Sequence, residues 1–214
     1  TEEIPQLLEV GYQNFMLNNP AHYSFFRGTK AAVIAGPYLY AFNSWAYQAL
    51  RSMGTPFFVS PLENNRQNLE RSIPVEVRPF CFVSLFAYPA LFRIRADLTE
   101  FYEFNRFSDT RNENFLLVSH DSSSLVVPEQ PFSIVDKVPF LKESGFSRFI
   151  LDFSGPPLKK MDYRDVMNAF KNSQPLANTT RFNWKNGFYM PKELGSKGAA
   201  KKPGPRSLPR SRHQ

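Results

Sequence analysis

The first 80 residues alternate short apolar runs with amphipathic segments, and this rhythm restricts the fold more than any other feature. Apolar runs predict strands at 14–17, 31–35, 56–60 and 75–80. Helices are predicted in between, in "PAHYSFFRG", "FNSWAYQALRSMG" and "ENNRQNLERS", after an opening helix in "IPQLLEVGYQ". Gly11, Gly28 and Gly54 end the helical stretches that contain them. Strands and helices alternating at this spacing predict a parallel sheet with right-handed crossovers.

The predicted strands are short and mostly apolar, without the alternation of a half-exposed strand. This pattern is typical of strands that are covered on both faces. A (β/α) barrel and an open doubly wound sheet both fit it. No G-x-G-x-x-G follows any strand, which removes the usual dinucleotide-binding argument for the open sheet.

The second half of the chain predicts a different arrangement. "ALFRIRA" and "NFLLVSHDSSSLVVP" read as antiparallel strands, the latter a hairpin that turns over "HDSSS". "PFSIVDKVPFLKESG" predicts a helix closed by Gly145, "FSRFILDFS" a strand, and "DYRDVMNAFKN" the last helix. We therefore expect an α/β domain over 1–190 with an appended antiparallel hairpin.

Composition narrows the class of protein. The chain has 214 residues, of which 42% are hydrophobic, and no apolar run approaches the roughly 18 residues of a membrane span. Its first residues show no signal-peptide pattern. The single cysteine, Cys81, cannot form an intramolecular disulfide or hold a zinc ion or an iron–sulfur cluster by itself. Its apolar flanks favour a buried, inert thiol over a nucleophile. These features predict a soluble, cytoplasmic protein without a cofactor or membrane partner.

Positive charge is concentrated at the C-terminal end. Residues 191–214 hold seven Lys or Arg against Glu193 alone, which accounts for +6 of the net charge of +7. Gly, Pro, Ser, Lys and Arg without large apolar residues predict a disordered segment. Such a segment either binds RNA or an acidic surface, or serves only to keep the protein soluble.

Candidate site residues follow from the fold, because parallel β/α folds bind ligands at the carboxyl ends of their strands. Amides and one carboxylate at these ends suit a polar ligand, and the residues are Asn18, Asn19, Ser60, Glu63 and Asn64. For Asn18 and Asn64 the alternative is helix capping. Glu76 and Arg78 lie two apart in a predicted strand and share a face, either as an ion pair or as cavity-lining groups. No G-x-S-x-G, H-E-x-x-H or Walker motif is present, so no catalytic or metal-binding residue is assigned.

Three segments resemble peptidase family U32 when they are read in order. They are "VIAGPYLYAFNSWAYQALRSMGTPFFVSPLENNRQNLE", "IPVEVRPFCFVSLF" and "RNENFLLVSHDSSSLVVPEQPFSIVDKVPFLKESGFSRFILDFS". The first resembles the family's later barrel segment, the second its following strand, and the third its C-terminal portion. The resemblance spans roughly residues 5–187 and leaves out the basic segment.

This resemblance implies the second half of a (β/α) barrel and peptide-bond hydrolysis. Some relatives act as RNA-base hydroxylation enzymes, and others carry an iron–sulfur cluster on four cysteines. In this chain Leu91 stands near an expected cluster ligand and Cys81 falls too early to replace it, so the cluster is not supported. The family's first-half signature is absent as well. The alternatives to a peptidase are RNA base modification and a non-catalytic partner that completes the barrel of a larger U32 subunit.

Overall fold

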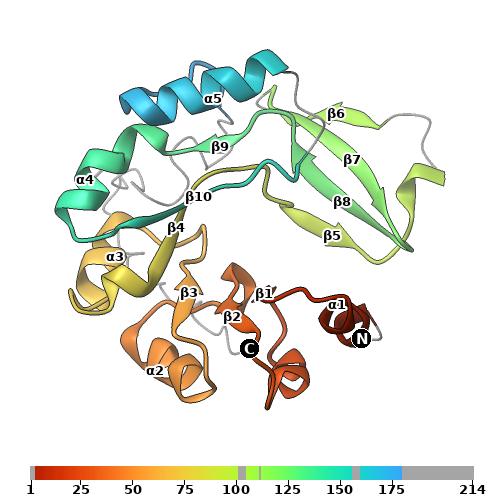
Figure 1. The fold of residues 1–214 in the computed structure, drawn as a ribbon. Coiled ribbons are helices and arrows are strands. Elements are labelled where there is room, and N and C mark those ends of the chain that lie inside the picture. The colour runs from red at the N-terminus through yellow and green to blue at the C-terminus, as the bar shows by residue number, and fades with distance from the viewer. Residues whose placement is uncertain (1–2, 101–104, 111, 156–159, 180–214) are drawn as a thin grey trace, which may run out of the picture.

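The computed structural model describes residues 3–100, 105–110, 112–155 and 160–179, which form a mixed α/β fold with two sheets (Figure 1). In the larger sheet five parallel strands are ordered β1-β2-β3-β4-β10, and β9 pairs antiparallel with β4. The strands are β1 (Asn14–Leu17), β2 (Ala32–Ala35), β3 (Phe57–Val59), β4 (Cys81–Ala87), β9 (Phe132–Ser133) and β10 (Arg148–Leu151). The α/β class is confirmed, and three of the four strands predicted in the first 80 residues are parallel neighbours. The disorder predicted for 191–214 lies outside the described residues.

Helices join the parallel strands, and asparagine side chains start several of them. The α-helices are α1 (Glu3–Glu9), α2 (Ser44–Ser52), α3 (Arg66–Ser72), α4 (Val138–Glu143) and α5 (Lys160–Asn172). Short 3-10 helices are η1 (Pro20–Phe26), η2 (Pro37–Leu39), η3 (Arg78–Phe80), η4 (Leu98–Glu100) and η5 (Val135–Lys137). The Asn43 Oδ1 accepts from the Ala46 N–H at 2.9 Å, and the Asn65 Oδ1 from the Asn68 N–H at 2.7 Å. These bonds satisfy N–H groups that the first turn of a helix leaves unpaired.

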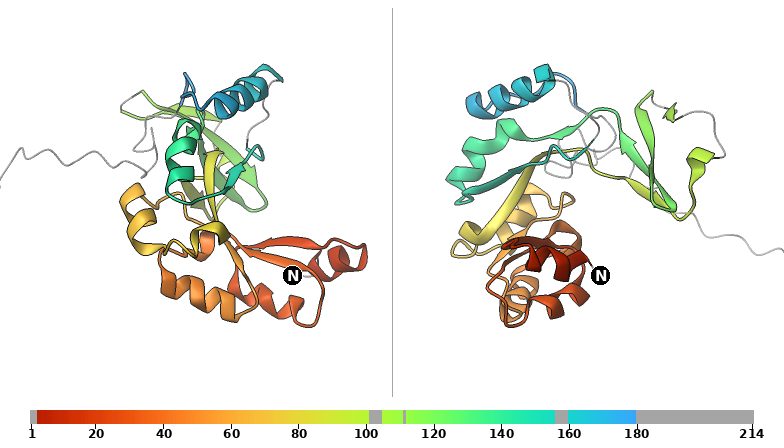
Figure 2. Two further views of the ribbon diagram at one scale, coloured as in Figure 1. Left: turned by 60° about the vertical axis from the view of Figure 1, so that its left-hand side comes forward. Right: turned by 45° about the vertical axis from the view of Figure 1, so that its right-hand side comes forward.

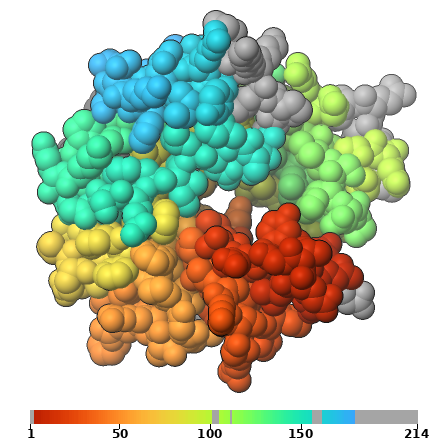
Figure 3. Space-filling model, in the orientation of Figure 1, coloured from red at the N-terminus to blue at the C-terminus, as the bar shows by residue number. Residues whose placement is uncertain are grey.

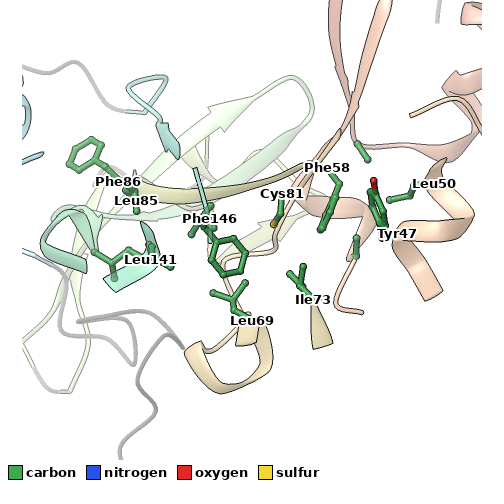
Figure 4. Packing of buried hydrophobic residues seen from close by; sticks show 14 of the residues in the cluster. Tyr47, Leu50, Phe58, Leu69, Ile73, Cys81, Leu85, Phe86, Leu141 and Phe146 are labelled. Atoms are coloured by element: carbon green, nitrogen blue, oxygen red, sulfur yellow. The ribbon is translucent and has the colours of Figure 1, made fainter. Parts of the chain in front are cut away.

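One face of the parallel sheet packs against helices and forms the main core. Buried side chains of β3 and β4, such as Phe58 and Cys81, face Tyr47 and Leu50 of α2 and Leu69 of α3 (Figure 4). Figure 4 also shows Leu141 and Phe146, from α4 and the loop after it, on the same side of the sheet. Many of the 22 Phe lie in or against this core.

The opposite face of the sheet is only partly covered, unlike the prediction of strands covered on both faces. Met16, Ile34 and Phe57 lie side by side on this face by strand register, and Met16 is 46% exposed. Next to them the guanidinium of Arg148 stacks 4.6 Å from the Phe57 ring centroid and 5.6 Å from that of Phe82. Figure 3 shows a hollow near the middle of the molecule, between the N-terminal segment (red) and the segment around β10 (teal).

The strand predicted at 75–80 is wrong. Val75 to Val77 form a turn, in which the Val77 and Arg78 N–H groups donate to the Pro74 carbonyl, and η3 follows. The β-branched residues favour a strand, but Pro74 and Pro79 cannot donate to a ladder and fix their own φ angles. The strand therefore begins at Cys81, after the second proline.

The second sheet is antiparallel and projects away from α2 and α3 (Figures 1 and 2). Its order is β5-β8-β7-β6, with bounds β5 (Phe92–Ile94), β6 (Arg106–Ser108), β7 (Asn114–His120) and β8 (Ser123–Pro128). The predicted hairpin is confirmed, since β7 and β8 pair from His120↔Ser123 outward, with Asp121 at φ 53° in the turn. β6 was not predicted. A small core of Phe115, Leu117 and Val126 supports this sheet.

Candidate functional site

Four polar side chains follow parallel strands at the carboxyl edge of the larger sheet. Asn18 follows β1, Tyr38 follows β2, Glu63 follows β3 and Asp152 follows β10. The edge of a parallel sheet collects these positions because all of its strands end on the same side. Of the predicted site residues, Asn18 and Glu63 belong to this group. Tyr38 also stands at the end of a strand that the sequence predicts, and Asp152 joins the group in the structure.

Tyr38, Glu63 and Asp152 form one electrostatic cluster. Partial burial raises the pKa of the Tyr38 phenol, and the nearby Tyr40, Glu63 and Asp152 raise it further. The charges of these two carboxylates act on the Tyr38 hydroxyl although the carboxylates follow different strands. The phenol therefore stays protonated at neutral pH and can donate a hydrogen bond. Asp152 is held in a tight turn in which its Oδ1 accepts from the Ser154 N–H at 2.9 Å and from the Ser154 hydroxyl at 2.6 Å.

Asn18 fixes the start of the segment that carries Tyr38. Its Oδ1 accepts from the Tyr38 N–H at 3.4 Å, so Asn18 pairs with the first turn of η2 and not with η1, the helix that follows it in the chain. The backbone of Gly36 passes directly over the Asn18 amide, where a Cβ atom would overlap the amide oxygen. The Gly36 N–H also donates to the Leu17 carbonyl at 2.7 Å. A side chain at residue 36 would therefore have to displace the Asn18 amide, so glycine suits this position by close approach rather than by its φ angle.

Ser60 and Asn64 lie at the same edge but are enclosed. Ser60 is 3% and Asn64 4% exposed. The Asn64 amide donates to the Ser60 hydroxyl at 3.0 Å, and its Oδ1 accepts from the Asn68 amide at 2.5 Å. The cavity beside them holds only about 10 Å³. These residues support the β3–α3 connection, and the space beside them is too small for an organic ligand.

The other predicted site residues, Asn19, Glu76 and Arg78, do not belong to the Tyr38 cluster. The Asn19 Oδ1 caps η1 by accepting from the Ala21 N–H at 3.0 Å. Glu76 is exposed in the turn before η3, at the amino end of β4, and no ion pair joins it to Arg78 within the described part of the chain. Arg78 instead donates to the carbonyls of Glu70, Ile73 and Ser144. The shared strand face predicted for Glu76 and Arg78 is wrong because that strand does not form.

Cys81 is fully buried at the start of β4. Burial strongly raises the pKa of its thiol. A thiol in this state is a poor nucleophile, since the thiolate is the reactive form. The predicted burial of Cys81 is confirmed, and its low reactivity stays a prediction.

Asp152 was missed by the sequence analysis, although a polar residue directly after an apolar strand is also the pattern that made Ser60 a candidate. In "RFILDFS" the first polar residue after an apolar strand is Asp152. The strand comes late in the chain, after the antiparallel segment, so its neighbour β4 is distant in sequence. Pairing across such a separation is not visible in local patterns.

The described residues hold no cluster of three or more His, Cys, Asp or Glu that could bind a metal ion. In the same ranges, no helix is long and apolar enough to cross a membrane. Comparison of the chain with protein-family models, with curated proteins and with solved structures found no match. The structure alone therefore describes this chain. It is an α/β protein with polar side chains at the carboxyl edge of a parallel sheet.

Proposed function

We propose that this chain is a hydrolase of the U32 type that acts on peptide bonds at the carboxyl edge of its parallel sheet. The cluster of Tyr38, Glu63 and Asp152 is the observation that carries this proposal. A phenol that donates and carboxylates that accept protons are the groups that acid–base hydrolysis of an amide requires. The resemblance to U32 proteins supplies the substrate class.

Each group has a chemical role in this scheme. The Tyr38 hydroxyl donates to the carbonyl oxygen and to the oxyanion that develops on it. Glu63, which is exposed, takes a proton from the attacking water and returns it to the amine nitrogen as the C–N bond breaks. Asp152, oriented by Ser154, holds the substrate amide N–H in place.

The test is cleavage of a fluorogenic peptide set by the full chain. Glu63→Gln and Tyr38→Phe are each expected to lower kcat/KM by about 100-fold or more, as loss of a general acid–base group does. Glu76→Gln is the matched control, since it is an exposed Glu at the opposite end of the strands. No cleavage by the wild type, or equal rates for Glu63→Gln and Glu76→Gln, would contradict the proposal.

RNA base modification is the alternative that the basic residues 191–214 favour. It is tested by comparing the nucleoside masses of RNA from cells with and without the gene. A change that Glu63→Gln reproduces would move the proposed activity from peptides to RNA. An unchanged nucleoside profile would argue against this alternative.

A second candidate function is completion of a barrel with another U32 chain. Its support is the strand order β1-β2-β3-β4-β10, which follows the chain, together with the partly exposed face that carries Met16 and Ile34. Right-handed crossovers between strands in chain order put their helices on one face, as in a barrel. Light scattering of the chain mixed with a U32 protein that carries the first barrel half is expected to show a complex. Met16→Asp should abolish it and Met53→Asp should not, because Met53 is equally exposed, at 48%, but lies beyond α2.

A further inference from the structure

The connection from β2 to α2 carries exposed aromatic side chains directly after Tyr38. Tyr40 and Phe42 follow it in this connection, and their rings stack with centroids 6.0 Å apart and 17° between the planes. Tyr40 is still 50% exposed, and Trp45 in the first turn of α2 is exposed as well. We propose that the Tyr40 ring, backed by Phe42, is the subsite for an aromatic side chain next to the scissile bond of a peptide, an inference that rests on the function proposed above.

The backbone of Tyr40 is held in a conformation that directs its ring onto Phe42. Its φ and ψ angles are 50° and 47°, in the left-handed region, where a Cβ atom makes the conformation costly. The Tyr40 N–H donates to the Pro37 carbonyl at 3.2 Å, and its carbonyl accepts from the Phe42 N–H at 2.9 Å. Bonds on both sides therefore impose the turn. Strained residues of this kind persist where the surrounding structure enforces them, and they gather at ligand sites.

A buried amide network holds Phe42 from the side of α3. The Asn68 amide donates to the Phe42 carbonyl at 3.1 Å and to the Asn64 Oδ1 at 2.5 Å. On the other side of Phe42, the next residue, Asn43, caps α2. Phe42 itself is half-buried. The Tyr40 ring therefore has a fixed support, and a group that stacks on a preorganised ring loses less free energy to ordering than one that meets a mobile ring.

The charges at this edge of the sheet favour a neutral ring over a nucleotide. Glu63 and Asp152 raise the pKa of Tyr38, so negative charge acts on this part of the molecule and opposes a phosphate. In the proposed reaction both carboxylates are engaged, Glu63 with the water proton and Asp152 with the substrate amide, so neither serves to pair with a cationic side chain. The side chain of Phe, Tyr or Trp requires no charge partner and gains from stacking on Tyr40.

Cleavage of three fluorogenic peptides by the full chain tests the proposal. They differ in one residue beside the scissile bond, which is Phe, Ala or Arg. The wild type should favour Phe over Ala by about 10-fold in kcat/KM, mainly through KM, as a stacked ring and its buried area provide. Tyr40→Gly removes the ring and suits the left-handed backbone, so the fold is retained and the preference should fall to about 2-fold or less. Tyr40→Phe should keep the preference, as should Tyr12→Gly, which removes an exposed tyrosine before β1, at the opposite end of the strands.

A binding measurement separates the subsite from the hydrolysis itself. N-acetyl-phenylalaninamide is titrated by NMR into the Glu63→Gln variant, which keeps the aromatic rings and lacks the proposed proton carrier. A ligand of this size is expected to bind with a dissociation constant of about 1 mM, and adding Tyr40→Gly should weaken it about five-fold or more.

The two measurements fail in different ways. If the wild type cleaves no peptide, the proposed function is wrong, and Tyr40-dependent binding of the amide alone decides the subsite. Binding that is absent, or that Tyr40→Gly leaves unchanged, would overturn the proposal. So would a Phe preference that survives in Tyr40→Gly, a higher kcat/KM for the Arg peptide than for the Phe peptide, or tighter binding of adenosine monophosphate than of the amide.

Discussion

Replacing Arg78 by methionine is expected to destabilise the fold through the loss of one group that joins two helices. The guanidinium donates to the Glu70 and Ile73 carbonyls at the C-terminal end of α3, at 2.7 and 3.0 Å. It also donates to the Ser144 carbonyl after α4, at 2.6 Å. The last carbonyls of a helix have no partner within the helix and carry its partial negative charge. Arg78 thus satisfies two helix ends at once from η3.

The magnitude follows from these three bonds. A hydrogen bond to a charged group contributes about 1.5–3 kcal/mol each. Arg78 is half-buried, so water can partly replace the lost donor, and methionine retains the packing of the aliphatic stem. We therefore expect a loss of about 3 kcal/mol in the free energy of unfolding rather than the full sum. For a chain of this size such a loss lowers Tm by roughly 6–12 °C.

Urea denaturation measures this loss as a shift in midpoint with an unchanged m-value. Arg71→Met is the matched control, because it removes the same charge from the last turn of α3 where the side chain is exposed. Its effect should stay within about 0.5 kcal/mol. A loss below about 1 kcal/mol for Arg78→Met, or an equal loss for Arg71→Met, would refute the assignment of the stabilisation to the carbonyl contacts.

Three further predictions concern other parts of the fold. Gly36→Ala should cost about 1–3 kcal/mol, because the new methyl group overlaps the Asn18 amide, and Asn18→Gly in the same chain should recover most of that loss in urea denaturation. Cys81 should resist a thiol reagent at mildly alkaline pH in the folded protein and react at once in urea, because burial raises its pKa; rapid reaction in the folded state would contradict this. The pKa of Asp97 is lowered by hydrogen bonds from the Ser119 and Thr99 hydroxyls, so its contribution to stability is present above the unfolded pKa and lost as pH falls through the folded one. An NMR titration should place its midpoint below the ordinary value of about 3.9 in the wild type, and Ser119→Ala should raise it.

The parallel sheet could be predicted from the sequence because its signals are local. Each of the first three strands is a short apolar run, and the predicted bounds agree with the structure within one residue. Gly11, Gly54 and Gly145 follow α1, α2 and α4 in the left-handed region, with φ of 93°, 89° and 88°. A glycine adopts this conformation without the strain that a Cβ atom causes. The residues that end these helices can therefore be recognised from the sequence within one helical turn.

The site was harder to predict because neighbouring asparagines have different partners. Asn19 and Asn65 cap η1 and α3, while Asn18 and Asn64, one residue before each, bond instead to Tyr38 and Ser60. All four are amides in a connection that leads from a strand to a helix. Which side chain meets a helix N–H depends on the path of the chain between strand and helix, and composition does not encode that path. The contacts of Arg78 could not be predicted from local sequence either, because its partner Ser144 is 66 residues away.

The partly covered face of the parallel sheet carries one charged side chain over its aromatic rings. Arg148 covers Phe57 and Phe82 there, and its Nε donates to the Pro79 carbonyl at 2.9 Å. A charged side chain over aromatic rings keeps an exposed apolar surface hydrated and discourages pairing with other sheets. At the other end of the sheet Met16 is 46% exposed on the edge strand β1, and no cation–π or ion-pair group of the described residues covers it. If another chain completes the sheet as the second candidate function requires, we expect it to pair at β1 rather than at β10, the other edge strand, and Met16→Asp should weaken that pairing more than Arg148→Ala does.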